Sequence, residues 1–312
     1  MFQWFKEPKI DFMKPRRFFM TLSAIGMLAG VYSCVLLYQG KANLGTDFGA
    51  GELLRMSSVN PVEIDKIRES LKSEGFPEAQ IQQVKDDSSK SYKLIIKIKH
   101  DPTKAVGGVG NEVLDVFNKA YPDAHFTLDG SDEVGPAVSE KLRDDATKAF
   151  IIAMIGILIY IAWRFDFRFA VAAIICTIHD ILVILAFVIL TGREFNLLQV
   201  TALLTLAGYS LNDTVVNFDR IRENLKFLLK DHTFISLVNL SVNETLSRTI
   251  NTSLTVFFTL LPLCFMGGDT LKDFAWTLQA GVIVGTYSSV FVASPILVEW
   301  NLMSGPKANT PS

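Results

Sequence analysis

Long runs of apolar residues, separated by short polar turns, occupy most of this chain. A helix needs about 20 predominantly apolar residues to cross a bilayer. Six runs have about that length: 18–38, 147–163, 169–190, 197–217, 248–266 and 275–299. The pattern predicts an α-helical membrane protein with six transmembrane helices. It divides the chain into a tail over 1–17, a first helix over 18–38, a polar insertion over 39–146, five helices within 147–303 and a tail over 304–312.

The polar insertion, residues 39–146, has a different periodicity. Residues 52–56, 79–84 and 124–128 resemble short strands, and apolar residues alternate with lysines between Tyr92 and Ile98 as they do in a strand. Two helices are expected between these strands. The first starts at the Asn60-Pro61 pair, and the second ends near Pro122. The resulting order, β-α-β-β-α-β, predicts an inserted ferredoxin-like α+β domain.

Glycines mark two further features. The cluster 107–110 lacks the Lys-Ser/Thr of a phosphate-binding loop, so we expect a flexible loop there, and residues 86–89 indicate a turn. The pairs Gly26/Gly30 and Gly281/Gly285 have the spacing that lets two membrane helices approach closely. We therefore assign these pairs to helix packing.

Composition supports a membrane protein and gives no sign of nucleic-acid binding. Hydrophobic residues make up 49% of the chain, and the net charge of −2 comes with no basic tract that would favour nucleic acid. The three cysteines, Cys34, Cys176 and Cys264, fall in predicted helices, where they are expected to pack as small apolar residues.

The distribution of basic residues predicts the orientation. Arginines and lysines gather in the first tail, in the turn after 147–163 and in the connection after 197–217, whereas the opposite loops carry only Arg193 and Lys272. The positive-inside rule places both termini in the cytoplasm and the insertion outside. The first apolar run follows a basic tail and lacks a small-residue cleavage site after it, so we expect an uncleaved anchor.

Four ionisable residues fall within the predicted spans or at their edges: His179, Asp180, Asp213 and Arg248. A charged side chain inside a bilayer costs roughly 2.5–3.5 kcal/mol on insertion scales and marks an ion path or a paired site by default. Low dielectric favours the neutral carboxylic acid, and a nearby cation favours the carboxylate. If the fourth and fifth spans are neighbours, Asp213 could gain a proton when Arg248 moves away and lose it when Arg248 returns.

Structural roles are the alternatives for each of these residues. Arg248 could extend to the lipid headgroups, Asp213 could bond its neighbours Asn212 and Thr214, and His179–Asp180 could be held by local hydrogen bonds. The connection from Arg220 to Asn243 mixes apolar and basic residues, which favours a solvated or interfacial helix and leaves a docking site open.

Several motifs resemble one known family. Residues 208–224, GYSLNDTVVNFDRIREN, resemble the signature of the SecF family of protein-export membrane proteins, and 244–249, ETLSRT, resemble its next motif. Residues 45–51 and 134–136 resemble the motifs that follow the first span and precede the second. Two positions depart from the pattern: Ala50 replaces a usual glycine, and Asn217 replaces an apolar residue at what we expect to be a helix end.

The resemblance implies a function that periodicity does not. It implies a subunit of the bacterial inner membrane that acts with SecD, the SecYEG channel and the SecA ATPase on preproteins, and it implies a relation to resistance-nodulation-division transporters. Protons, or sodium ions, would drive it. Asp213 and Arg248 match the family's ion-coupling positions, and Asn212, Thr214, His179, Asp180 and Asn251 are candidates for supporting them. Neither a cofactor, nor a metal, nor an enzymatic activity is expected.

Two other functions are carried as alternatives. A small-molecule efflux subunit of the same superfamily would be a much larger chain with two outside domains. An intramembrane aspartyl protease would use Asp180 and Asp213, but such enzymes place one aspartate in Gly-x-Gly-Asp, whereas Asp213 follows Ser210-Leu211-Asn212.

Overall fold

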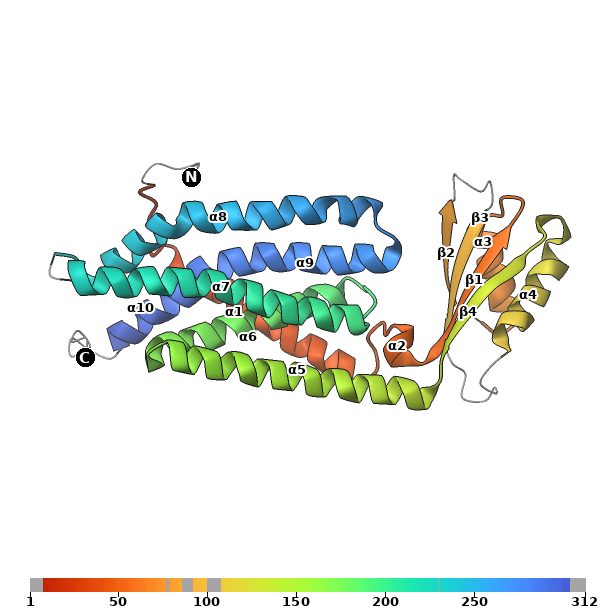
Figure 1. The fold of residues 1–312 in the computed structure, drawn as a ribbon, viewed down its shortest axis with the longest axis horizontal. Helices are drawn as coiled ribbons and strands as arrows, with labels where there is room; N and C mark the ends of the chain where they lie inside the picture. Colours follow the sequence, from red (N-terminus) through yellow and green to blue (C-terminus); the bar gives the residue numbers. More distant parts are fainter. Residues whose placement is uncertain (1–7, 77–78, 86–91, 100–107, 230, 304–312) are drawn as a thin grey trace. The chain divides into compact units, whose positions relative to one another are not determined.

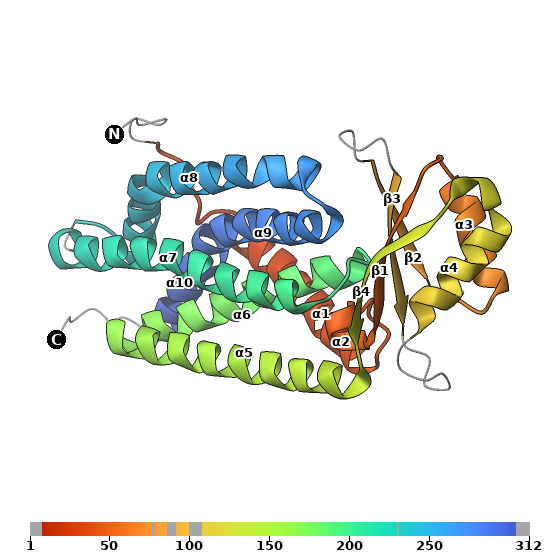
Figure 2. The ribbon, with the colours of Figure 1, turned by 45° about the vertical axis from the view of Figure 1, so that its right-hand side comes forward.

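The computed structural model describes residues 8–76, 79–85, 92–99, 108–229 and 231–303. These residues form two compact units, one of Met1–Asn43 with Ala149–Ser312 and the other of Leu44–Lys148. Within the first unit the elements are helical (Figures 1 and 2). The predicted turn at 86–89 and the tails over 1–7 and 304–312 lie outside the described residues.

The helical unit contains α1 (Arg16–Tyr38), most of α5 (Pro136–Arg164), α6 (Phe167–Leu190), α7 (Leu197–Leu228), α8 (Phe234–Met266), α9 (Asp269–Ser288) and α10 (Ser294–Met303). Among the described residues, five helices are long and apolar enough to cross a membrane: α1, α5, α6, α8 and the continuous run Leu271–Met303. The predicted span 197–217 coincides with α7, which is long enough at 32 residues but is not one of these five. Its polar side chains, several of them buried against other helices, lower its average hydropathy.

The connection between the fourth and fifth predicted spans is largely helical, as predicted, but its residues extend the two spans themselves. α7 continues to Leu228, and α8 already begins at Phe234, where the Thr233 side chain caps its first turn by accepting from Ser236 N. A helix continues for as long as its side chains find partners, and here the two extensions pack on each other. α7 and α8 thus form one long antiparallel hairpin (Figure 1).

The last predicted span, 275–299, is divided. α9 gives way to a π-helical turn, η2 (Ser289–Ala293), before α10. Pro295 lies in the first turn of α10 and has no backbone N–H to donate, and a helix widens or breaks where such a bond is lost. Ser294 Oγ donates to Ser289 O at 3.1 Å, which satisfies one carbonyl in the widened turn.

The glycine pairs pack helices together, as predicted. A Cβ on Gly30 of α1 would overlap the backbone of Leu182 in α6, and a Cβ on Gly281 of α9 would overlap the side chain of Leu206 in α7. Gly285 lies one turn further along α9, and a Cβ there would lie 3.0 Å from the Ser210 Cβ. Small residues therefore bring α9 close to α7 near the centre of the unit.

The second unit is an antiparallel sheet with two helices on one face (Figure 2). In chain order it contains a short α2 (Thr46–Gly49), β1 (Gly51–Ser58), α3 (Ile64–Ser73), β2 (Gln80–Lys85), β3 (Tyr92–Lys99), α4 (Val109–Ala120), η1 (Pro122–Ala124) and β4 (Thr127–Val134). The sheet order is β2-β3-β1-β4, with every neighbouring pair antiparallel. The element order that the alternating pattern predicted is thus present.

Three local predictions in this unit were wrong. Asn60 does not cap α3, which starts at Ile64 after Glu63, because the Asn60 side chain instead donates to Asp123 O at 2.7 Å. Val109 and Gly110 are not loop but the first residues of α4, and Gly108 precedes them outside the helix with a φ of 97° that suits glycine. Gly107 lies outside the described residues. The last strand begins at Thr127, because η1 and the left-handed His125 occupy 122–125.

Candidate functional site

The antiparallel contact between α7 and α8 is held by polar side chains, and we call it the α7–α8 seam. On one level Tyr209 Oη donates to Ser253 Oγ at 3.4 Å, and two turns further on Thr245 Oγ1 donates to Asn217 Oδ1 at 2.6 Å. Residues four apart on a helix lie on one face. One turn from either pair, along both helices, the facing residues are therefore Asp213 of α7 and Thr249 of α8.

Asp213 is buried in this seam, with 3% of its surface exposed. Its Oδ2 atom has no hydrogen-bond partner among the described residues. Arg248, the neighbour of Thr249, is exposed on α8 and is near enough to attract the carboxylate electrostatically. No nitrogen–oxygen contact within 4.0 Å joins these two described residues. The two candidate ion-coupling residues thus lie at the same level of the hairpin without forming an ion pair.

A second buried cluster surrounds Asp180 of α6. His179 Nδ1 lies 2.8 Å from Asp180 Oδ1, and Asp180 Oδ2 accepts hydrogen bonds from Ser210 of α7 and, at 2.8 Å, from Ser288 of α9. Ser288 is the last residue before the π-helical turn. Asp180 therefore ties three helices together where α9 is interrupted, and Ser210 lies one turn from Asp213 on the same helix.

The other candidates lie in different surroundings. Thr214 is buried and faces α6, with its hydroxyl 3.9 Å from Cys176 Sγ. Asn212 is exposed on the outer surface of α7, and Asn251 is half-buried on α8. The structure brings neither Asn212 nor Thr214 into the seam beside Asp213. Their supporting roles remain predictions.

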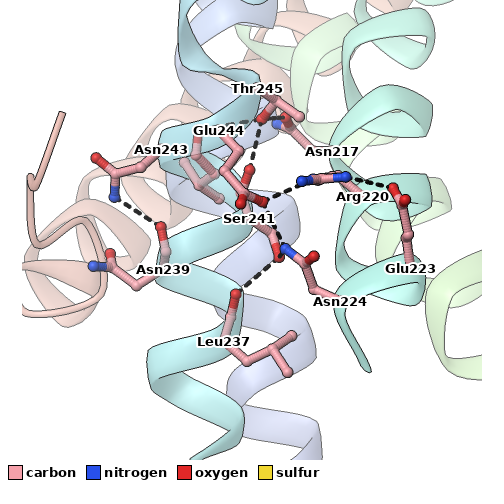
Figure 3. A network of polar contacts seen from close by, with 11 residues as sticks. Asn217, Arg220, Glu223, Asn224, Leu237, Asn239, Ser241, Asn243, Glu244 and Thr245 are labelled. Carbon is pink, nitrogen blue, oxygen red and sulfur yellow. Dashed lines mark hydrogen bonds and ion pairs between the residues drawn. The ribbon is translucent and has the colours of Figure 1, made fainter. Parts of the chain in front are cut away.

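The seam continues beyond Asn217 as a charged network (Figure 3). Arg220 binds Glu244 across the seam at 2.7 Å and Glu223 on its own helix at 2.6 Å. Asn224 Nδ2 donates to Glu244 Oε2 at 2.6 Å and to Ser241 Oγ at 2.9 Å. These contacts fix the register of α7 against α8, and with it the level of Arg248 relative to Asp213.

Sequence reasoning missed the seam residues Asn217, Thr245 and Thr249. Asn217 was placed at a helix end, which was wrong: α7 continues past it to Leu228, and only 1% of Asn217 is exposed. A signal was available, because polar residues recur at helical spacing on both partners. They are Tyr209, Asp213, Asn217, Arg220 and Asn224 on α7, and Ser241, Thr245, Thr249 and Ser253 on α8.

No group of three His, Cys, Asp or Glu side chains that could hold a metal ion occurs in the described part of the chain. The seam itself offers a carboxylate, a guanidinium and the neutral amide and hydroxyl groups between them. Such groups can bind and release a proton or water.

The fold and the seam together define a membrane protein of several helices with a buried carboxylate between two of them. A family described as protein export membrane protein SecD/SecF, C-terminal, matches residues 113–303. The chain belongs to the SecD/SecF family of protein-export membrane proteins.

Relatives agree over nearly the whole chain. The protein translocase subunit SecF of Thermodesulfovibrio yellowstonii is 39% identical over 299 residues, which cover 96% of this chain and 97% of that protein. SecDF of Thermus thermophilus is 37% identical over 95% of this chain. The crystal structure of SecDF from that organism superposes with a TM-score of 0.78 at 35% identity, covering 95% of this chain and 39% of that one. This chain thus spans about two fifths of the SecDF chain that it matches.

Proposed function

We propose that this chain is an accessory subunit of the Sec preprotein translocase, driven by an ion gradient and acting with SecD to promote export across the inner membrane. Its relatives are named as translocase subunits, which supports the role in protein translocation. One observation supports the coupling role above all others: Asp213 is buried in a helix seam with one carboxylate oxygen unpartnered among the described residues, at the level of Arg248.

In this proposal Asp213 alternates between two partners. Arginine keeps its charge under all working conditions, whereas a carboxyl group in low dielectric can take up a proton. With Arg248 close, Asp213 stays ionised; with Arg248 turned outward, as it is in this structure, Asp213 can bind a proton instead. One proton crossing a membrane at 100 mV supplies about 2.3 kcal/mol for movement.

We propose six membrane spans, the five helices named above and α7, and a ferredoxin-like domain in the periplasm. The sheet order β2-β3-β1-β4 with two helices on one face supports this domain. For α7, the support is its position in the bundle: Gly281 and Gly285 of α9 pack against it on one side and α8 on another. A helix held this way can carry polar residues into the membrane because they face other helices.

The proposed orientation places both termini in the cytoplasm. Arg16 of α1 binds Glu299 of α10 at 2.7 Å, and Arg164 at the end of α5 binds Asp219 of α7 at 2.6 Å. These ion pairs join the start of α1 to α10 and the end of α5 to the C-terminal half of α7, at one end of the helical unit (Figure 1). That end carries Arg16, Arg164, Arg168, Arg220 and Arg222, which favours the cytoplasmic side.

The proposed partners are SecD, the SecYEG channel with SecA, the preprotein and the lipid bilayer, with no nucleic acid. Apolar side chains exposed along α1 and α5, such as Leu28, Ile152 and Ile159, suit contact with lipid. The outer surfaces of α7 and α8 instead expose Asn212 and Arg248, which suit a protein neighbour. The fusion of SecD and SecF in one relative supports SecD as that neighbour.

The alternatives are not favoured. The relatives named above are translocase subunits rather than efflux proteins, and we propose no catalytic activity. A protease would need two carboxylates facing one water molecule. Asp180 instead bonds His179, Ser210 and Ser288, and within the described residues no hydrogen bond joins it to Asp213.

Asp213→Asn is expected to abolish gradient-stimulated export while the complex still assembles, because the amide cannot take up and release a proton. Transport of a labelled preprotein into inverted membrane vesicles, with a proton gradient and then a sodium gradient, measures this. Asp231→Asn makes the same chemical change in the exposed connection between α7 and α8 and should leave export unchanged. Full gradient stimulation with Asp213→Asn would refute the coupling role.

A further inference from the structure

At the level of Asp213 and Thr249, no hydrogen bond between described side chains joins α7 to α8. Three polar atoms lie on neighbouring turns of the two helices here, Asp213 Oδ2, Asn217 Nδ2 and Thr249 Oγ1, and none has a hydrogen-bond partner in the described part of the chain. Asn217 and Thr249 are each 1% exposed and Asp213 is 3% exposed. One turn to either side, hydrogen bonds do join the two helices, from Tyr209 to Ser253 and from Thr245 to Asn217.

Burying a polar atom without a hydrogen-bond partner destabilises the fold, so three such atoms on neighbouring turns of a seam point to a bound ligand. The donor pattern identifies its class. Thr245 donates to Asn217 Oδ1, which leaves the Asn217 amide N–H groups, one helical turn from Asp213, without an acceptor among the described residues. A cation cannot accept a hydrogen bond from these groups, whereas a water molecule can accept from Asn217 and donate to Asp213 and Thr249.

We propose that Asp213, Asn217 and Thr249 form a binding site for one ordered water molecule, and that Asn217 makes this site selective for a proton over a sodium ion. The proposal rests on the coupling role of Asp213 and adds the route and the identity of its ion. Sodium requires a shell of oxygen ligands, and the Asn217 N–H groups present positive hydrogens where such an ion would lie.

The bound water carries the proton to the carboxylate. As an incoming proton forms a new O–H bond with the water oxygen, the O–H bond that the water donates to Asp213 Oδ2 breaks and that proton binds Oδ2. The water therefore stays neutral and keeps accepting from Asn217 throughout. The neutral Asp213 no longer attracts Arg248. Asn217 and Thr249 are positioning residues in this step, because they hold the water and exchange no proton themselves.

Variants of these two residues test the site in inverted vesicles that contain the assembled complex. Wild type is expected to respond to a proton gradient and not to an equal sodium gradient. Asn217→Asp replaces the N–H donors with oxygen and should gain sodium-driven export. Thr249→Val should lower proton-driven export by roughly three- to tenfold, as for the loss of one hydrogen bond, and Thr249→Ser should restore it.

The controls make the same chemical changes elsewhere. Asn301→Asp near the end of α10 and Thr21→Val on the exposed surface of α1, where the hydroxyl bonds only Arg17 O, should change neither the ion preference nor the rate. Wild-type export driven equally by sodium would mean that the carbonyl oxygen of Asn217 faces the site, and would overturn the proposal.

The outcomes distinguish a failure of the water site from a failure of the coupling role of Asp213. If Asp213→Asn keeps gradient-stimulated export, the coupling role itself fails. If Asp213→Asn loses it while Asn217→Leu and Thr249→Val both keep the full proton-driven rate, only the water site fails. Should Asn217→Leu not assemble, the Thr249→Val and Thr249→Ser pair still decides the outcome, because threonine, valine and serine differ little in size.

Discussion

Ala50 joins α2 to β1 with a backbone that disfavours its own side chain. Its φ is 51° and its ψ is 143°, a conformation that residues with a Cβ rarely adopt. Its N–H donates to Ser139 Oγ at 3.1 Å, which holds this geometry in place. The family pattern that the chain resembles has glycine here, and the structure explains why: glycine adopts a positive φ at little cost.

Ala50→Gly is therefore expected to stabilise the protein by about 1 kcal/mol, since it removes the Cβ penalty of the left-handed region. Thermal unfolding of the purified chain measures the shift. Ala149→Gly makes the same change inside α5 and should lower stability by about 1 kcal/mol, as glycine does in helices. A loss of stability at both positions would contradict the argument from φ.

At the scale of elements, the α7–α8 hairpin is the part of the fold on which the site depends. The hairpin is bound to the N-terminal segment as well as to itself. Asn239 and Asn243, one turn apart on α8, bond the backbone of Ile10 and Phe12 at 2.8–3.1 Å. α8 therefore has partners on two sides, and the position of Arg248 on it is determined by contacts several residues away.

Glu244→Gln is expected to loosen the hairpin, because it removes the charge that binds Arg220 across the seam while leaving the volume of the side chain. We expect a loss of about 0.5–1 kcal/mol, seen as faster hydrogen exchange in residues 237–245. Glu223→Gln removes the other partner of Arg220, but that pair lies within α7 and is more exposed. Equal losses of stability in the two variants would show that the Arg220–Glu244 pair stabilises the hairpin no more than the Arg220–Glu223 pair does.

At the scale of the whole molecule, the two units have separate hydrophobic cores. One core joins the helices of the first unit, with Phe218, Ile221, Leu237 and Val298 among its members. The other joins the sheet to α3 and α4, with Leu54, Ile67 and Phe117 among its fully buried side chains. A unit with its own closed core has the contacts that it needs to fold alone.

A fragment of residues 44–148 is therefore expected to fold in solution and to unfold in one cooperative transition, measured by circular dichroism. Leu54→Ala should then destabilise it by about 2–5 kcal/mol, because Leu54 is fully buried. Val59→Ala, on a largely exposed side chain, should cost less than about 0.5 kcal/mol. A non-cooperative transition would show that this unit needs the rest of the chain.

Much of this architecture could be read from the chain itself. Apolar runs of bilayer length predicted where α1, α5, α6, α8 and α9 lie, and alternation between Tyr92 and Ile98 predicted β3. The family motifs indicated Asp213 and Arg248 as a pair. These signals are local, because the periodicity of one element is written in consecutive residues and needs no knowledge of its neighbours.

Tertiary structure alone decided what surrounds those residues. Asn217 bonds Thr245, and Asp213 lies at the level of Thr249, only because a hairpin with a specific register joins α7 to α8. Asn60 bonds Asp123 instead of capping α3 for the same reason. The hydrogen-bond partner of a polar side chain can come from a distant part of the chain, and the residues next to it in sequence do not identify that partner.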